Sequence, residues 1–131
     1  MVDDDKDDIF LTKMAFKRGD VDSEFIGLPS GKALFDHIKN KGIGSIDLLL
    51  LDLNMPIQNG HEVLKKLNDY PHFSDLCTIM FSTSRRSIDK DLSRNYGAAA
   101  FVVKPGSVSE TGDFVKKVVK ILNSREYAVA C

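Results

Sequence analysis

Five side chains in this 131-residue chain have types and spacings that suit phosphoryl transfer, and they follow the ends of apolar segments. Asp3 and Asp4 lie at the amino end, and Asp52 directly follows a run of four leucines. Ser82 and Lys104 follow the ends of two later apolar runs. In an open parallel sheet, ligands and chemistry collect at the carboxyl ends of the strands. We therefore expect the five side chains to meet in one shallow pocket.

The chemistry follows from the charges in that pocket. Carboxylates at ~4 Å and an effective dielectric constant near 20 repel by about 4 kcal/mol per pair. Lys104 and a hard divalent cation can supply the counter-charges. Magnesium suits such a site, because it takes oxygen ligands, keeps several waters and binds few protein carboxylates. With Asp52 as the nucleophile and Ser82 donating a hydrogen bond to a phosphoryl oxygen, the set is sufficient for phosphoryl transfer to Asp52.

Each of these residues also has an ordinary structural interpretation. The aspartates at the amino end can form a solvated or disordered tail, and Asp52 can cap a helix or turn. Ser82 and its neighbours are typical of turns, and Lys104 before a proline is typical of a surface lysine at a strand end. The three histidines have no ligand or triad spacing. The order of acids, Asp52, hydroxyl and lysine at successive strand ends is what favours phosphoryl transfer.

The elements that must position these residues alternate along the chain. Apolar runs and helix-period segments predict βαβ units, hence a parallel sheet with helices on both faces. We expect strands at residues 24–28, 46–51, 77–81 and 101–103. We expect helices at residues 8–17, 31–41, 61–69, 87–96 and 110–123. The helix at the amino end should follow a strand, yet only Met1 and Val2 precede the aspartates.

Composition indicates one ordinary globular domain. The net charge is −1 and the pI is about 6.3, so we predict neither nucleic-acid nor membrane partners. No apolar run reaches the ~18 residues of a membrane span, and the acidic amino end is unlike a secretory signal. Cys77 and Cys131 show no zinc spacing and no disulfide framework. These features favour the reducing cytoplasm as the location.

The chain resembles the receiver domain of two-component response regulators over essentially its whole length. The matching motifs are Val2-Asp-Asp-Asp5, Leu51-Asp-Leu-Asn-Met-Pro56 with Gly60, Met80-Phe-Ser-Thr-Ser84, Tyr96-Gly97-Ala98 and Val102-Val-Lys-Pro105. The resemblance implies a flavodoxin-like, doubly wound α/β fold, with a five-stranded parallel sheet of order 2-1-3-4-5. It extends to single-domain receivers of the phytochrome-associated kind. We therefore expect a receiver domain at residues 1–124, a tail at residues 125–131 and no output domain.

The resemblance implies a phosphorylation site with its metal. Asp52 would be the phospho-acceptor and a ligand of Mg²⁺. Asp3 and Asp4 would form the acidic pair, with Asp4 the direct metal ligand and Asp3 acting through water. Asn54 would lend its backbone carbonyl to the metal.

The resemblance also implies a switch. Ser82 would be the switch hydroxyl and Lys104 the phosphate-pairing lysine, before a cis bond to Pro105. Phe101 occupies the position of the switch aromatic and, as phenylalanine, would rotate inward as a packing event alone. Thr83 stands where many receivers have alanine, and its bulk is expected to slow dephosphorylation by narrowing the access of water.

The implied function is a stand-alone receiver, not an enzyme. A sensor histidine kinase or a phosphotransfer protein would donate the phosphoryl group, and the changed surface would bind a downstream protein that the sequence does not identify. A homodimer is also compatible with the sequence. The alternative is a degenerate receiver that binds partners without phosphorylation. A hydrolase of the haloacid dehalogenase kind is disfavoured, because the position two residues after Asp52 is Asn54 and not an acid.

The main departure from the family is at the opening strand, because only Met1 and Val2 precede the aspartates. In the family this strand lies in the middle of the sheet. Its loss would leave backbone groups of two neighbouring strands unpaired and would displace Asp3 and Asp4. We favour a natural start upstream of Met1. Alternatively, residues 127–131 fill the gap, or two chains exchange a segment.

Overall fold

The computed structural model describes residues 1–105, 111–124 and 128–130, and these residues form a parallel α/β sheet structure. The strands lie in the order β1-β2-β3-β4 and all neighbouring pairs are parallel. Their bounds are β1 (Leu48–Leu51), β2 (Cys77–Ser82), β3 (Ala100–Val103) and β4 (Ala128–Ala130). The family's five-stranded order is therefore not reproduced as regular strands in the described part of the chain.

The five predicted helices are confirmed, with bounds that differ from the prediction by up to two residues. They are α1 (Lys6–Arg18), α2 (Gly31–Lys41), α3 (Gly60–Leu67), α4 (Ser87–Asn95) and α5 (Thr111–Ser124). Residue 110, the predicted start of the last helix, lies outside the described residues. Two short 3₁₀ helices, η1 (Ile43–Ser45) and η2 (Phe73–Asp75), precede β1 and β2. Among the described residues, no helix has the length and apolar character that crossing a membrane requires.

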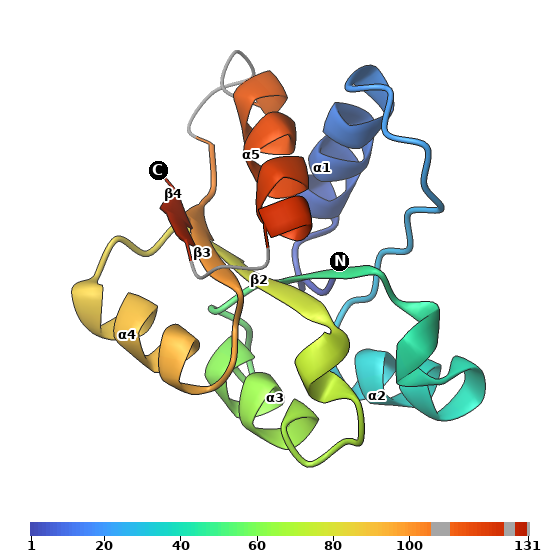
Figure 1. Ribbon diagram of the computed structural model, residues 1–131, viewed down its shortest axis with the longest axis vertical. Helices are drawn as coiled ribbons and strands as arrows, with labels where there is room; N and C mark the ends of the chain where they lie inside the picture. Colours follow the sequence, from blue (N-terminus) through green and yellow to red (C-terminus); the bar gives the residue numbers. More distant parts are fainter. Residues whose placement is uncertain (106–110, 125–127, 131) are drawn as a thin grey trace.

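The helices cover the two faces of the sheet as separate groups (Figure 1). Side chains of α1 and α5 pack on one face, together with Ile79 and Phe81 of β2. Side chains of α2 and α3 pack on the other face, together with Met80 of β2. Successive strand residues point to opposite faces, so both faces of a buried strand must be apolar. This burial makes the strands a rigid support for the residues at their carboxyl ends.

The opening strand is reduced to Met1 and Val2, but it still lies in the middle of the sheet. Val2 forms parallel bridges to both Leu28 and Leu51. Its N–H donates to the Leu50 carbonyl at 2.8 Å, and its carbonyl accepts from the Asp52 N–H at 2.9 Å. The loss of pairing that a missing strand would cause therefore does not occur here. The backbone groups of Val2 bond the β1 side, while the Met1 carbonyl accepts from the Leu28 N–H and the Asp3 N–H donates to the Leu28 carbonyl on the other side.

Two further expectations are corrected by the sheet. The predicted strand at residues 24–28 forms a single bridge, at Leu28, and the rest of that segment has no regular structure. Phe25 instead packs against Phe16 of α1, with ring centroids 5.9 Å apart. Within the predicted filling segment 127–131, the described residues 128–130 do not fill the central gap, because β4 pairs with β3 on the side away from Val2. Residues 127 and 131 themselves lie outside the described residues.

Candidate functional site

The aspartate run at the amino end is part of the fold. Asp5 is the N-cap of α1, and its carboxylate accepts hydrogen bonds from the N–H groups of Asp7 and Asp8 at 2.9 and 3.3 Å. Asp7 and Asp8 lie in the first turn, where negative charge is favourable near the positive end of the helix dipole. The Asp5 N–H donates to Asp3 Oδ1 at 2.9 Å. The interpretation of these residues as a solvated or disordered tail was therefore wrong.

Three predicted carboxylates meet at the carboxyl edge of the sheet. One oxygen from each of Asp3, Asp4 and Asp52 lies within 4.8 Å of the others. Asp3 and Asp52 are buried, with 1 % and 5 % of their surface exposed, whereas Asp4 is exposed. Three oxygen donors with one open side suit a divalent metal that keeps several waters. The residues present therefore fit the expected metal.

Lys104 supplies the positive charge of this cluster. Its Nζ donates to Asp3 Oδ2 at 2.8 Å and to Asp8 Oδ2 at 2.9 Å, and it lies 3.5 Å from Asp52 Oδ1. The expected cis bond to Pro105 was wrong, because the described residues contain no cis peptide. The trans form of an X–Pro bond is favoured by about 0.5–1 kcal/mol. In this arrangement the Lys104 N–H also donates to the Ser82 carbonyl at 2.8 Å.

The cluster shifts the ionisation of both of its central groups. Burial raises the pKa of Asp52 to about 6; the Asp3 carboxylate also raises it, while the Lys104 charge opposes the shift. Burial alone would lower the pKa of Lys104, but its hydrogen bonds to Asp3 and Asp8 outweigh burial and raise that pKa. Lys104 is therefore a permanent cation, and Asp52 is an ionised nucleophile only above about pH 6.

The loop after Asp52 is held close to the sheet by Gly60, the first residue of α3. Its N–H donates to the Leu53 carbonyl at 2.8 Å. A Cβ on this residue would collide with the Asp52 carbonyl and approach the Leu53 Cα to 2.8 Å. Only glycine allows this approach, since it alone has no Cβ. Asn59 caps the helix in a capping box with Glu62, which fixes where α3 begins.

Ser82 and Asn54 lie between Asp52 and α4. The Ser82 hydroxyl is fully buried and accepts from Asn54 Nδ2 at 3.3 Å and from the Ser84 N–H at 3.2 Å. The Ser84 hydroxyl in turn donates to Asp89 Oδ2 in α4 at 2.5 Å. The Asn54 N–H donates to Asp52 Oδ1 at 3.4 Å. A continuous set of hydrogen bonds thus joins the candidate acceptor to α4.

The two remaining residues named from the sequence are Phe101, in the strand next to that of Ser82, and Thr83, the residue after Ser82. Phe101 is fully buried in β3 and pairs in register with Met80 of β2, so it belongs to the core beneath the site. Thr83 follows Ser82 and is exposed, as an effect on water access requires. Asp8 was not predicted as a partner of Lys104, because the run of aspartates contains no spacing that distinguishes it.

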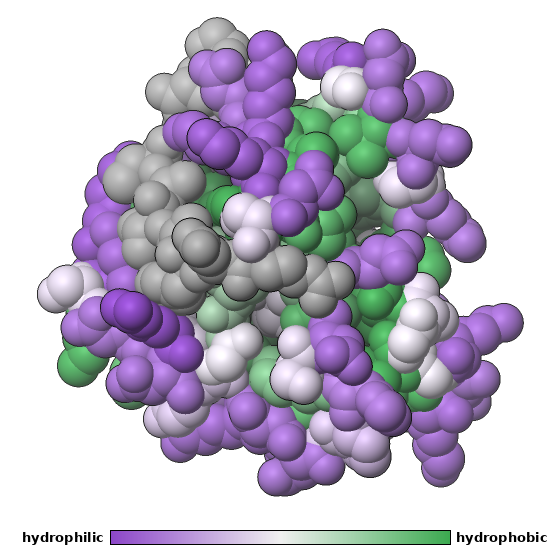
Figure 2. All heavy atoms as spheres, in the orientation of Figure 1, coloured by the Kyte–Doolittle hydropathy of each residue, from purple (hydrophilic) through white to green (hydrophobic). Residues whose placement is uncertain are grey.

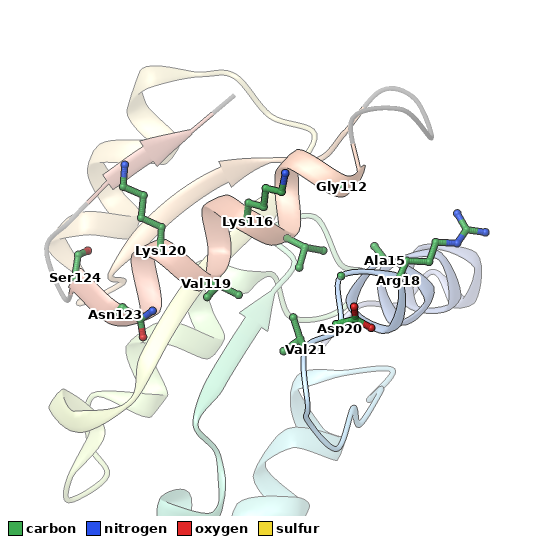
Figure 3. A pocket seen from close by; sticks show the side chains of 12 residues that line it. Ala15, Arg18, Asp20, Val21, Gly112, Lys116, Val119, Lys120, Asn123 and Ser124 are labelled. Atoms are coloured by element: carbon green, nitrogen blue, oxygen red, sulfur yellow. The ribbon is translucent and has the colours of Figure 1, made fainter.

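An open pocket of about 940 Å³ lies elsewhere, between α1 and α5. Figure 3 shows its lining along α5 and at the end of α1, including Ala15, Val21 and Val119. Figure 2 shows apolar atoms exposed between the polar outer surfaces of these two helices. The cavity shares no residue with the carboxylate cluster. The pocket is therefore separate from the candidate site.

Comparisons with known proteins agree on one family. The model of the response regulator receiver domain matches residues 1–129. The response regulator Rcp1 of Synechocystis is 25 % identical over 122 residues, which are 90 % of this chain and 83 % of Rcp1. The uncharacterized transcriptional regulatory protein YcbL of Bacillus subtilis is 34 % identical over 77 residues, 59 % of this chain. The match covers only 33 % of YcbL, so the activity of that whole protein is not carried over.

Solved structures show the same similarity. The phosphorylated cyanobacterial phytochrome response regulator RcpA has a TM-score of 0.79 and 27 % identity, with 94 % of this chain and 91 % of RcpA covered. The Mn²⁺-bound form of Rcp1 has a TM-score of 0.76 and 26 % identity, with 89 % and 87 % covered. These matches confirm the resemblance to phytochrome-associated receivers that the sequence motifs indicated.

Proposed function

The chain belongs to the response regulator receiver family, and from this premise we propose that Asp52 accepts a phosphoryl group from a phosphohistidine. The donor is a sensor histidine kinase or a phosphotransfer protein. The observation that carries the proposal is the position of Asp52: its carboxylate is buried at a strand end, within 4.8 Å of two other carboxylates and 3.5 Å from a lysine ammonium. Receiver domains are signalling modules, so the expected product is a changed surface.

The proposed transfer assigns a task to each side chain. An oxygen of ionised Asp52 forms a bond to phosphorus as the N–P bond of the phosphohistidine breaks, and the electron pair returns to the imidazole nitrogen. Lys104 offers its ammonium to a phosphoryl oxygen, and Ser82 offers a hydroxyl hydrogen bond. A Mg²⁺ ion held by Asp3, Asp4, Asp52 and the Asn54 carbonyl would supply further charge neutralisation when bound.

The surface around Asp52 supports a protein donor. Of the large apolar side chains that are exposed, four lie on segments that directly follow the strand-end residues of the site. These are Phe10 (61 % exposed), Leu11 (52 %), Ile57 (105 %) and Ile88 (51 %). An apolar side chain exposed beside the site is available for contact with a protein donor. We place the docking surface of the donor on these four side chains.

The response of the fold is expected to pass through Ser82. When its hydroxyl moves toward a phosphoryl oxygen, the bonds from Asn54 and Ser84 to that hydroxyl must change. The bond from Ser84 to Asp89 connects this movement to the start of α4. Phe101 is fully buried in the neighbouring strand and can fill the vacated space by packing. A downstream protein would bind the surface that α4 presents in its new position.

The test is intact-mass measurement after incubation with acetyl phosphate, with and without Mg²⁺, on the natural chain and on Asp52→Asn. We expect a gain of one phosphoryl mass in the natural chain that requires both Mg²⁺ and Asp52. Asp47→Asn is the matched control, because Asp47 is exposed at the other end of the same strand. Absence of an adduct in the natural chain contradicts the proposal and favours a receiver that binds partners without phosphorylation.

A further inference from the structure

We propose that Asp8 is a positioning residue that competes with the phosphoryl group for the ammonium of Lys104, a role that rests on the function proposed for Asp52. Asp8 lies outside the group of carboxylates that can hold a metal. It reaches the site through Lys104, which it contacts at 2.9 Å. Removing its charge should therefore leave more of the lysine charge for a phosphoryl group.

Asp8 is held in place by the start of α1. It is the third residue of the helix, and its N–H donates to the Asp5 cap at 3.3 Å. Its backbone carbonyl accepts from the Thr12 hydroxyl at 2.7 Å. The carboxylate is therefore carried on a fixed backbone, and its direction toward Lys104 does not depend on a flexible chain end.

The Lys104 ammonium faces three carboxylates in this state, and only two of its contacts are short. An ammonium group carries three N–H donors. Two are directed to Asp3 and Asp8, at 2.8 and 2.9 Å, and the longest contact, 3.5 Å, is to Asp52. A phosphoryl group on Asp52 extends the negative charge beyond the position of its carboxylate. The two short contacts hold the ammonium on the side of Asp3 and Asp8, so a shift of Lys104 toward the phosphoryl group weakens them.

Of the two short contacts of Lys104, the one to Asp8 is the easier to break. The Asp3 side chain is fully buried, and its other oxygen already accepts from the Asp5 N–H. Breaking the Asp3 contact would leave a buried charge without its partner, which is costly. The Asp8 side chain is 34 % exposed, so water can replace the lysine. Its negative charge also remains close to the phosphoryl group and repels it.

The experiment measures binding of beryllofluoride, a mimic of a phosphoryl group on aspartate, to the full chain in excess Mg²⁺. Backbone and lysine-ammonium NMR signals report the bound fraction and the environment of Lys104. We expect Asp8→Asn to bind about fivefold more tightly than the natural chain, which is about 1 kcal/mol at 1.4 kcal/mol per tenfold. The Lys104 ammonium signal of the free protein should shift in Asp8→Asn, and the affinity gain should shrink at high salt.

Two variants make the result specific. Asp8→Glu keeps the carboxylate and should restore the affinity of the natural chain. Asp7→Asn removes a neighbouring charge from the same helical turn without touching Lys104, and it should change the affinity less than twofold. Equal or weaker binding by Asp8→Asn, or the same gain in Asp7→Asn, overturns the role of Asp8. Failure of the natural chain to bind beryllofluoride and to accept a phosphoryl group from acetyl phosphate overturns the proposed function instead.

Discussion

Asp52→Asn should make the metal-free protein more stable at pH 8, although it removes the proposed phospho-acceptor. The Asp52 side chain is 6 % exposed and lies in a cluster with Asp3 and Asp4. Burial first, and then the neighbouring Asp3 charge, raises its pKa from 3.8 to about 6. The ionised form of Asp52 therefore lowers the stability of the folded state. An asparagine of nearly the same shape removes that charge and keeps one oxygen as an acceptor.

The magnitude follows from the shift. One pKa unit corresponds to about 1.36 kcal/mol, so a shift from 3.8 to about 6 sets an upper limit of about 3 kcal/mol. Coupling to Lys104 and the access of water through the open edge reduce this value. We therefore expect Asp52→Asn to raise the free energy of unfolding by about 1–3 kcal/mol at pH 8.

The sign of the pH dependence is defined by the same shift. Between about pH 4 and 6 the folded state binds more protons at Asp52 than the unfolded state does. The natural chain therefore loses stability relative to the variant as pH rises through this window, and the difference is constant above it. Below about pH 4 the two proteins should be equally stable at this position.

The assay is urea unfolding followed by far-ultraviolet circular dichroism, in a chelator, at several pH values from 4 to 8. Excess Mg²⁺ should then stabilise the natural chain more than Asp52→Asn, because a metal that binds the folded state adds to its stability. Asp47→Asn, at an exposed residue just before β1, should change stability little at any pH. If Asp52→Asn is no more stable than the natural chain at pH 8 without metal, the electrostatic reasoning is wrong.

Two other substitutions should also stabilise the fold. The Thr78 hydroxyl is buried and has no hydrogen-bond partner among the described residues. Thr78→Val should therefore raise the free energy of unfolding by about 1 kcal/mol in the same urea assay. A loss of stability would show that the hydroxyl does have a hydrogen-bond partner. Ile57 has φ of 70° and is fully exposed, so Ile57→Gly should add about 0.5–1 kcal/mol by relieving strain. The same change should slow phosphoryl transfer from a protein donor but not from acetyl phosphate, and equal slowing with both would remove Ile57 from the docking surface.

The positions of the candidate side chains could be predicted from the sequence, because residues that follow parallel strands all lie at the same edge of the sheet. A run of four leucines had to be a buried strand, and Asp52 therefore had to lie at its carboxyl end. Ser82 and Lys104 were placed by the same reasoning, and the structure brings both to the cluster. The role of Asp8 was not predictable in this way, because contact with Lys104 depends on the cap that starts α1.

The strand expected at residues 24–28 could not be predicted correctly from residue types alone. Phe25 and Ile26 suit a strand by residue type, but β propensity measures how well a side chain fits its surroundings. The opening segment offers only a few backbone partners: Met1 donates to the Ile26 carbonyl at 2.8 Å, and within residues 24–28 Val2 bridges Leu28 alone, so no regular strand forms. The aromatic ring of Phe25 is then better placed against Phe16 of α1. The length of one strand was therefore determined by its partner.

The short opening strand explains why the acidic residues remain in position. The Val2 carbonyl accepts from the N–H of Asp52, and the Asp3 N–H donates to the Leu28 carbonyl at 3.0 Å. The backbone of Asp3 is thus bonded on one side, and the residue before it is bonded directly to the candidate acceptor. These bonds set the distance between the two carboxylates before any metal or lysine contact is considered. The geometry of the site depends on backbone pairing at Val2 and Asp3, which the short opening segment already provides.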